Sequence, residues 1–411
     1  MRTVNRSLQN NIRIIYVMGF FHAFMVVVPV FVPLLQGYGL SMSQVLQTQA
    51  IFALTTALFE VPSGYIADLW GRRPAILLGS VLNGIGFFSL FWADSFVDFL
   101  VYEAILGVGF SLISGADLAL LYDTEVYLAE RGEPGGAGAG KSLSRLISVE
   151  AGAAGVAGIV ASLMLLWSME AVVILQAVVG FAPLILGLGL VEVPRPAART
   201  GHRDNARRIL EVLLFGKPVV LWTVFAICLF GLLGLYVFWS YQKYWEFQGV
   251  PLNYFGYIWA AFALTVSLAA RYTSALEQRV GTRVVLCLIA GLPVLGLLGM
   301  ALGPGWIGVM FGFANQVSRG MSMSQFYEAL NRRVPGDFRA TVNSLVSLGI
   351  RAAFIATGPL LGIALDSLGI QDTLLLMVAV FGPLMAVVLV PLLGRIHRVR
   401  RTDRLWASTV G

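Results

Sequence analysis

Ionisable residues interrupt several apolar segments of this sequence, and they separate by sign along the chain. The acids lie in the first half and the bases in the second half: Glu60, Glu103, Asp117 and Glu150, against Arg271, Arg319 and Arg351. Removal from water favours the neutral form of a carboxyl group, so such a group can bind and release a proton. A guanidinium group stays charged at any working pH and pairs with anions. The acids are therefore candidate proton carriers, and the arginines are candidate ligands of an anion.

The segments that carry these residues are too apolar for a water-soluble domain. Hydrophobic residues make up 58% and charged residues 12% of the 411 positions, whereas a soluble domain has about 25% charged residues. A helix of about 20 apolar residues crosses the hydrocarbon core of a bilayer. The sequence contains twelve such segments, at residues 12–35, 43–68, 74–93, 97–123, 142–166, 170–191, 218–242, 253–276, 284–302, 305–330, 339–365 and 371–393. It therefore predicts an all-α polytopic membrane protein in contact with lipid.

The connections between these segments alternate in character. One set is short, such as Gly303 with Pro304, and the other set carries the arginines, such as Arg72 with Arg73. Of the 28 basic residues, 24 lie on the side of the membrane where the arginine-bearing connections are. The exceptions are Lys243, Arg271, Arg319 and Arg351. The positive-inside rule then places both termini in the cytoplasm. Arginine outnumbers lysine by 25 to 3, a usage typical of GC-rich bacteria, so we expect the inner membrane of a bacterial cell.

The longest polar stretch, residues 192–217, follows the sixth segment and contains six basic residues. We interpret it as a cytoplasmic linker between two six-helix bundles, residues 1–191 and residues 218–411, the second of which ends in a basic tail. The two halves resemble each other weakly. Tyr122 with Asp123 in the fourth segment matches Tyr327 with Glu328 in the tenth, at an offset of 205 residues. Two related halves would leave such a trace.

One loop indicates a particular protein family, which the composition alone does not. Between the second and third segments, from Gly64 to Pro74, the sequence reads Gly-Tyr-Ile-Ala-Asp-Leu-Trp-Gly-Arg-Arg-Pro. This loop resembles the cytoplasmic signature loop of the major facilitator superfamily, G-x-x-x-D-x-x-G-R-[KR], at every defining position. The number of segments and the central linker also match, so the resemblance covers essentially the whole chain. It implies two pseudo-symmetric six-helix bundles that move a small solute by alternating access.

The loop has two interpretations. Gly71 permits a tight turn, and Asp68 and Arg72 are four residues apart, so they could pair if the helix continued through the turn. The resemblance implies a conformational clasp between the two halves, in which the aspartate faces the start of the eleventh helix near residues 337–340. We assign the clasp to Gly64, Asp68, Gly71, Arg72, Arg73 and Asp123, with Glu125 as an alternative to Asp123. The other interpretation is a solvated turn without a conformational role.

The resemblance also sorts the charged residues. In the superfamily, the third, sixth, ninth and twelfth helices are outer supports, and here the interiors of those segments carry no charge. Insertion of an ionisable group near the bilayer centre costs about 2.5–3.5 kcal/mol of free energy, so each such residue is expected to have a function or a partner. Proton coupling is one reason, for which we rank Asp117 first and Glu60 second, and static ion pairs between the halves are the other. We expect at least one of Arg319 and Arg351 to face the open cavity.

Further candidate solute ligands are a histidine and aromatic residues. His22 titrates near neutrality, although a lone histidine on a helix is more often a hydrogen-bonded polar residue. Phe24 and Phe230 could line an apolar pocket. Trp239 belongs to the aromatic group that ends the seventh segment: Tyr236, Phe238, Trp239, Tyr241, Tyr244 and Trp245. This group is interpreted as an interfacial aromatic belt or, alternatively, as a lining for the solute.

These observations lead to two transport hypotheses. The first is a proton-coupled secondary transporter that exports small amphipathic or aromatic compounds. The alternative is an organic-anion (carboxylate) transporter that uses Arg319 and Arg351 for import or export. The direction stays open, because Glu103 stands where many family members have an arginine, and the fifth segment lacks the Gly-Pro pair of many exporters.

Other function classes find little support in the sequence. Three scattered histidines form neither a metal site nor a nucleophile with its base, so we expect no enzyme, no metal and no cofactor. There is no phosphate-binding Gly-x-x-x-x-Gly-Lys loop, which excludes the usual ATP-driven mechanism. We expect a monomer with a small-molecule solute and protons as partners, and no nucleic acid.

Overall fold

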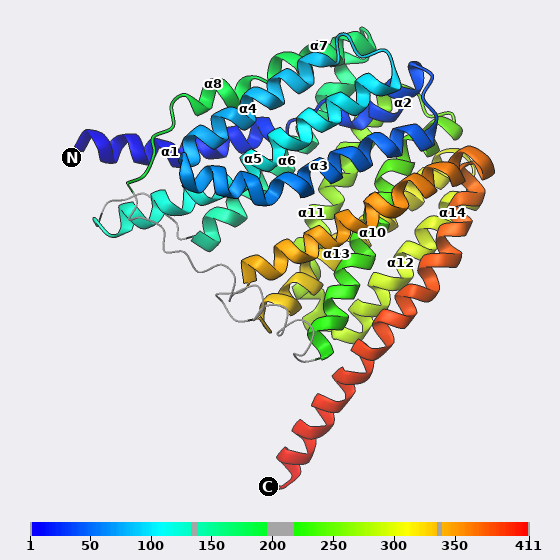
Figure 1. The fold of residues 1–411 in the computed structure, drawn as a ribbon. Coiled ribbons are helices and arrows are strands. Elements are labelled where there is room, and N and C mark those ends of the chain that lie inside the picture. The colour runs from blue at the N-terminus through cyan, green and yellow to red at the C-terminus, as the bar shows by residue number, and fades with distance from the viewer. Residues whose placement is uncertain (1, 133–138, 195–217, 335–338, 410–411) are drawn as a thin grey trace. The chain divides into compact units, whose positions relative to one another are not determined.

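In the computed structural model, the described residues are 2–132, 139–194, 218–334 and 339–409, and all of their regular elements are helices. The first half of the chain forms α1 (Arg2–Ala23), α2 (Phe31–Gly37), α3 (Met42–Leu69), α4 (Arg72–Ser89), α5 (Phe96–Ala129), α6 (Ala139–Met164), α7 (Met169–Val179) and α8 (Ala182–Gly187) (Figure 1). The second half forms α10 (Pro218–Phe247), α11 (Phe255–Val280), α12 (Thr282–Leu302), α13 (Gly305–Asn331) and α14 (Arg339–Thr409). Short 3-10 turns, Val28–Val30 and Leu252–Tyr254, precede α2 and α11.

The helices confirm the predicted all-α polytopic fold class. Nine of them in the described part of the chain are long and apolar enough to cross a membrane. The last of these, Thr341–Gly394, has 54 residues and bends at Gly369, where φ is 78°, so it holds two of the predicted segments. The less apolar helices α4 and α13 match two further predicted segments. The helices are thus consistent with the twelve predicted spans.

Two predicted segments are interrupted. The first, residues 12–35, was expected to be continuous, but α1 ends at Ala23 and a 3-10 turn containing Pro29 precedes α2. Proline has no N–H to donate to the helical ladder, so the chain bends there. The sixth, residues 170–191, divides at Gly180 and Phe181, and its helical part ends at Gly187. The residues after Gly187 leave the helix and take part in the site described below.

Contacts between residues group the chain into two compact units. The described residues of Met1–Arg199, Pro251–Ala263 and Ile355–Ile363 form unit 1, and those of Thr200–Val250, Leu264–Phe354 and Ala364–Gly411 form unit 2. The boundaries expected from the sequence, at residues 191 and 218, stay a prediction. Most of the expected linker, residues 195–217, lies outside the described residues.

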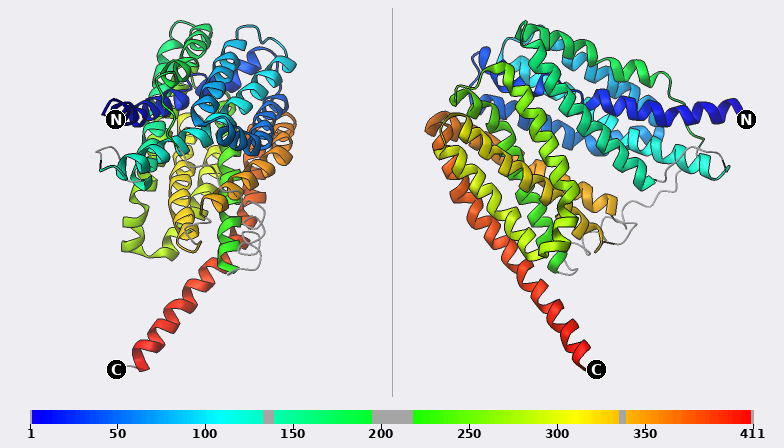
Figure 2. Two further views of the ribbon diagram at one scale, coloured as in Figure 1. Left: turned by 60° about the vertical axis from the view of Figure 1, so that its left-hand side comes forward. Right: turned by 180° about the vertical axis from the view of Figure 1, so that it is seen from behind.

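In unit 1, helices α1, α4, α5 and α8 lie side by side (Figures 1 and 2). A cluster of buried apolar side chains packs between α1, α4, α5 and the residues after α8: Leu8, Ile15, Met18, Ala75, Ile76, Leu120, Leu190 and Val193. Farther along, α4 and α5 meet at two glycines. A Cβ atom on Gly79 would lie 2.8 Å from the carbonyl oxygen of Gly109. The absence of a side chain therefore lets the two backbones touch.

In unit 2, the aromatic residues of α10 pack against α12 and α13. Tyr241, Tyr244 and Trp245 have exposed fractions of 1%, 0% and 0%. The hydroxyl of Tyr241 donates to the carbonyl of Gly312 at 3.1 Å, and that of Tyr244 donates to the carbonyl of Met300 at 2.8 Å. For these three residues the interpretation as an interfacial belt is wrong. They are core residues, and for the two tyrosines backbone carbonyls accept the hydrogen bonds of the hydroxyl groups inside the unit.

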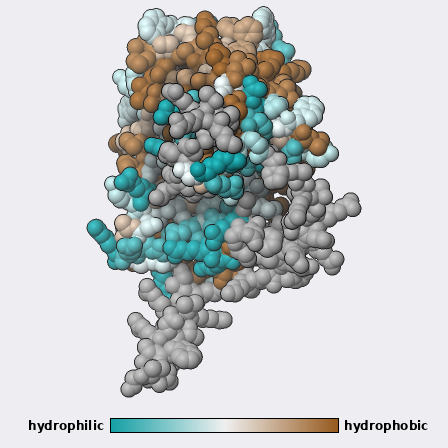
Figure 3. All heavy atoms as spheres, turned by 90° about the vertical axis from the view of Figure 1, so that its left-hand side faces the viewer, coloured by the Kyte–Doolittle hydropathy of each residue, from teal (hydrophilic) through white to brown (hydrophobic). Residues whose placement is uncertain are grey.

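Large hydrophobic side chains cover much of the outer surface. Val61 is 80% exposed and Trp167 is 73% exposed, and Figure 3 shows hydrophobic residues spread over the upper part of the face that it draws. Soluble monomers rarely expose apolar patches of more than a few hundred Å². In a bilayer these side chains would contact lipid, in agreement with the composition.

Candidate functional site

The turn between α3 and α4 contains the signature loop. The helix does not continue through it: α3 ends at Leu69, and Gly71 adopts a φ of +103° before α4 begins at Arg72. The condition under which Asp68 could pair with Arg72 along one helix is therefore not met. Asp68 is exposed, and no hydrogen bond or ion pair of its side chain is found within the described residues.

Arg72 pairs instead with an acid on α5. Its Nε lies 2.9 Å from Oδ2 of Asp123, and both side chains are about one-fifth exposed, at 20% and 21%. Asp123 also makes further interactions. The alternative acid, Glu125, is buried and accepts a hydrogen bond from the hydroxyl of Ser142 on α6. The structure thus brings Arg72 to Asp123 rather than to Glu125.

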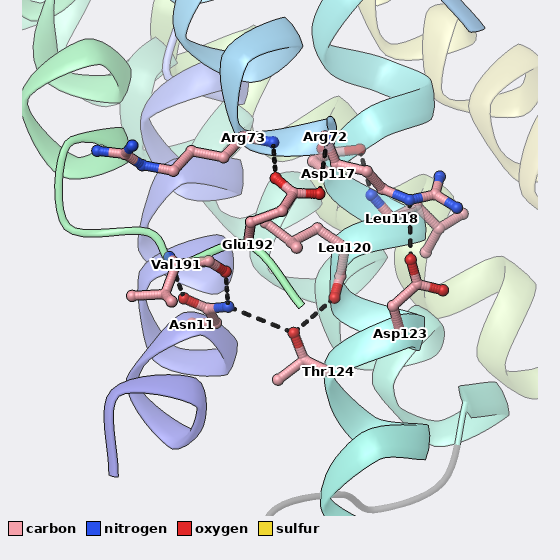
Figure 4. A network of polar contacts seen from close by, with 10 residues as sticks. All are labelled: Asn11, Arg72, Arg73, Asp117, Leu118, Leu120, Asp123, Thr124, Val191 and Glu192. Atoms are coloured by element: carbon pink, nitrogen blue, oxygen red, sulfur yellow. Dashed lines mark hydrogen bonds and ion pairs between the residues drawn. The ribbon is translucent and has the colours of Figure 1, made fainter. Parts of the chain in front are cut away.

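The start of α4 is bound by an acid that sequence reasoning missed. Glu192 accepts hydrogen bonds from the backbone N–H groups of Arg72 at 3.0 Å and Arg73 at 2.8 Å, one on each carboxylate oxygen (Figure 4). The free N–H groups and the positive end of the helix dipole make a helix N-terminus a good partner for a carboxylate. The guanidinium of Arg73 donates to the carbonyl of Leu188 at 3.2 Å.

The backbone next to Glu192 is held by α1. The Asn11 amide donates to the carbonyl of Val191 at 2.7 Å and accepts from its N–H at 2.9 Å (Figure 4). Asn11 also lies 3.4 Å from the hydroxyl of Thr124 on α5. Leu190 and Val193 are buried, at 2% and 4% exposed. Residues 188–193, which we name the docked segment, are thus bound to α1 and α4.

The docked segment explains why Glu192 was missed. The sequence places residue 192 at the start of the predicted linker, where an acid is ordinarily solvated. The apolar residues that flank the acid in Leu190-Val191-Glu192-Val193 indicate a segment that packs against the protein, but they do not identify what Glu192 binds. Of the other clasp residues, Gly64 lies on α3 with open space around it. The expected partner of Asp68 at residues 337–340 lies partly outside the described residues, so the clasp itself stays a prediction.

Two of the candidate proton carriers lie together in unit 1. Asp117 on α5 is close enough to Glu150 on α6 for their charges to interact. Oδ1 of Asp117 accepts from the N–H of Leu118 (Figure 4). The Glu150 carboxylate lies against α1, with Oε1 3.6 Å from where a Cβ on Gly19 would be. Among the described residues, neither acid has a basic partner.

The other two acids have different surroundings. Glu103 is 4% exposed and accepts a hydrogen bond from the amide of Gln49 on α3. Glu60 on α3 is half-buried and interacts with other residues of the chain. Of the four acids, Asp117 and Glu150 are the two whose charges are close enough to interact.

His22 faces the interior of unit 1. Its Nδ1 lies 3.3 Å from the amide nitrogen of Asn83 on α4, and its ring is 4.5 Å from that of Phe110 on α5. An amide nitrogen can only donate, so Nδ1 is the acceptor and the proton of the neutral ring sits on Nε2. Nε2 is buried and has no hydrogen-bond partner in the described part of the protein. Phe24 is buried and stacks on Phe20 at 5.5 Å.

Unit 2 contains a small cleft between α10, α12 and α13 with a cavity volume of about 20 Å³. The residues that line it are Phe230, Leu233, Gly234, Val237, Tyr241, Pro293, Asn315, Gln316, Ser318, Arg319 and Ser322. Of the predicted ligands, the structure places Arg319 and Phe230 here. Trp239 is buried elsewhere on α10, Arg271 is exposed on α11, and Arg351 is half-buried on α14 with interactions of its own.

No residues are placed to hold a metal in the described part of the chain, where clusters of three or more His, Cys, Asp or Glu are absent. The arrangement offers instead an acid pair that could hold a proton, a cleft with one guanidinium group, and a network that binds the docked segment.

Comparisons with known proteins agree with the fold and the loop. Solved structures with the same fold include the nucleoside transporter NupG, with a TM-score of 0.70, 13% identity and coverage of 93% of this chain and 97% of that one. A D-xylose-proton symporter gives a TM-score of 0.68 at 14% identity, covering 93% and 96%. A bacterial homologue of the human lysosomal transporter Spinster gives 0.64 at 17% identity, covering 93% and 91%.

At these identities the solved structures establish the fold alone. The sequence itself gives the stronger result, because residues 14–333 match the Major Facilitator Superfamily. This match spans most of the 411 residues and includes the signature loop and the acids of unit 1. The chain is therefore a member of the Major Facilitator Superfamily of membrane transporters.

Proposed function

We propose that this transporter is proton-coupled and exports small amphipathic or aromatic compounds by alternating access. The observation that carries the proposal is the neighbouring pair Asp117 and Glu150, for which the described residues supply no cation. Two ionised carboxylates in an apolar span would repel each other, and a proton on one of them removes the repulsion. When the pair becomes hydrated on one side of the membrane, that proton can leave.

The solute class is supported by the cleft in unit 2. Phe230, Leu233 and Val237 give it an apolar wall, which suits an aromatic or aliphatic group better than a sugar. The fold neighbour named a D-xylose-proton symporter supports proton coupling as a property that this fold can carry. Export follows if the acid pair exchanges protons for solute, because an inward proton gradient then drives the solute outward.

The proposal includes the placement of the molecule. We infer a monomer in the inner membrane of a bacterial cell, with both termini in the cytoplasm. The distribution of basic residues, 24 of 28 on one side in the predicted topology, supports this orientation.

The experiment uses inside-out membrane vesicles, into which an exporter accumulates its solute when a pH gradient is imposed. A panel of labelled aromatic cations, neutral aromatics and aromatic carboxylates identifies a transported compound. Asp117→Asn should lose uphill accumulation but keep exchange between labelled and unlabelled solute, because exchange needs no net proton movement. The matched control is Glu130→Gln, which removes an exposed acid just after α5. Uphill accumulation that survives in both Asp117→Asn and Glu150→Gln would contradict the proposal.

A further inference from the structure

Glu125 is a buried acid that belongs neither to the acid pair nor to the ion pair of Arg72. It lies on α5 with 5% exposed surface, and its Oε1 accepts a hydrogen bond from the hydroxyl of Ser142 on α6. Its Oε2 is buried and has no hydrogen-bond partner among the described residues. A buried carboxylate oxygen without a donor is costly while the group is ionised. A proton on Glu125 removes the charge and with it most of that cost.

No basic side chain of the described residues is bound to Glu125. On the neighbouring helices, Arg72 of α4 pairs with Asp123 at 2.9 Å. Arg145 of α6 lies over the ring of Tyr16 on α1, 5.6 Å from its centre. An ionised Glu125 would therefore be stabilised in the described part of the protein by a neutral hydroxyl group alone.

The register of α5 and α6 places Glu125 in line with the acid pair. Asp117 of α5 interacts with Glu150 of α6, and Glu125 of α5 is bonded to Ser142 of α6. The second pair lies eight residues later on α5 and eight residues earlier on α6, so the two helices are antiparallel and both pairs lie on one seam. Eight helical residues span about 12 Å. Glu125 is thus about two turns from the acid pair, toward the connection with Arg131, which the predicted topology places in the cytoplasm.

Two leucines, which we name the leucine layer, lie between the two polar pairs. Leu121 on α5 and Leu146 on α6 are each midway between them along the helix, and they are 1% and 4% exposed. A distance of about 12 Å is far beyond the length of a hydrogen bond, and a closed apolar layer holds no water. A proton can therefore pass between the pairs when water enters the leucine layer, and it is blocked while the layer is closed.

We propose that Glu125 is a proton-binding site at the cytoplasmic end of this seam and passes protons from the acid pair to the cytoplasm. Water in the leucine layer takes a proton from a carboxyl group of the pair and gives one to the carboxylate of Glu125. Glu125 then releases its proton to cytoplasmic water. The pair has lost one proton, the cytoplasm has gained one, and Glu125 has returned to its starting state. The inference rests on the proposed proton coupling and adds the route that the proton takes.

The test measures carboxyl protonation in the purified full chain in detergent micelles by infrared difference spectroscopy, with protons as the only ligand. A neutral carboxyl group gives a C=O stretching band that its ionised form lacks. We expect one such band to be lost in Glu125→Gln. In Ser142→Ala it should move to higher frequency, because the hydroxyl group no longer donates to the carboxyl group. Glu130→Gln, which removes an exposed acid just after α5, is the control and should keep the band unchanged.

A step in pH tests the route. The band of the acid pair, identified by its loss in Asp117→Asn, should relax at least about tenfold more slowly in Glu125→Gln, because a positioned proton carrier has been removed. Glu125→Asp keeps a carboxyl group and should restore part of the rate. Glutamine keeps an oxygen that can accept from Ser142, so a purely structural role of Glu125 would leave the relaxation at the rate of the parent.

The inference is overturned if no band depends on Glu125, or if the acid pair relaxes in Glu125→Gln as it does in the parent. Should Glu125→Gln not fold, Ser142→Ala decides, and a spectrum identical to that of the parent overturns the inference. The measurement needs neither solute nor gradient. Uphill accumulation that survives in Asp117→Asn and Glu150→Gln would contradict the proposed function and leave the band of Glu125 in place, so the two failures are distinguishable.

Discussion

At the scale of single residues, a charged residue inside an apolar segment can be predicted from the sequence to belong to a site. A charged residue in a polar segment cannot, because most such residues are simply solvated. Asp117, Glu150 and Arg319 stand out in the sequence because each interrupts an apolar run, and the structure places them in an acid pair and in a cleft. Glu192 could not be found this way. Its role depends on the fold that brings residue 192 to residues 72 and 73, and no local pattern contains that contact.

Glu192 gives the first prediction. Glu192→Gln keeps the size of the side chain but removes the negative charge that two backbone N–H groups and the helix dipole stabilise. We expect the free energy of unfolding to fall by about 1–2 kcal/mol, the usual size of such an effect in a partly buried site. Denaturant unfolding of the purified protein measures it. Glu130→Gln, an exposed acid, is the control, and equal stability of the two variants would refute the role of Glu192.

At the scale of helices, most of the membrane-spanning segments could be predicted because a bilayer restricts what can cross it. A span must be long and apolar, so composition alone located the segments, and the structure is consistent with the twelve. The interruptions were harder to predict. Pro29 bends the first segment, and the helical part of the sixth segment ends early at Gly187. Both interruptions depend on the hydrogen-bond partners that the backbone groups released from the helix find in the folded protein.

The crossing of α4 and α5 gives a prediction at this scale. Gly79→Ala would place a Cβ 2.8 Å from the carbonyl oxygen of Gly109 and 2.9 Å from the Cβ of Leu112, so the helices must separate. Overpacking of this kind costs about 1–3 kcal/mol. The midpoint of thermal unfolding should therefore fall. Gly115→Ala on α5, where nothing lies within 4 Å, should leave it unchanged, and the same midpoint in both variants would show that the crossing tolerates a methyl group.

At the scale of the whole molecule, the family resemblance implies a conformational role for Asp68. We predict that Asp68→Asn changes the balance between inward-open and outward-open states and leaves the affinity for solute in the favoured state nearly unchanged. The reason is that Asp68 is exposed and belongs neither to the acid pair nor to the residues that line the cleft. Single cysteines, introduced after replacing Cys228 and Cys287, report the two states through labelling by an impermeant maleimide.

The control for this prediction is Asp94→Asn, an exposed acid in the short loop between α4 and α5. It should leave the labelling pattern of the parent intact. Identical labelling in Asp68→Asn and the parent would mean that the loop is only a solvated turn, which was the other interpretation of the sequence.

The central claim is that solute and protons move in exchange. The most direct measurement uses proteoliposomes loaded with a transported solute and a pH-sensitive dye, diluted into solute-free buffer at the same pH. As solute leaves, we predict that the lumen becomes acidic, and that this change is absent in Asp117→Asn. A lumen that stays at constant pH while solute leaves, or that becomes alkaline, would contradict the account.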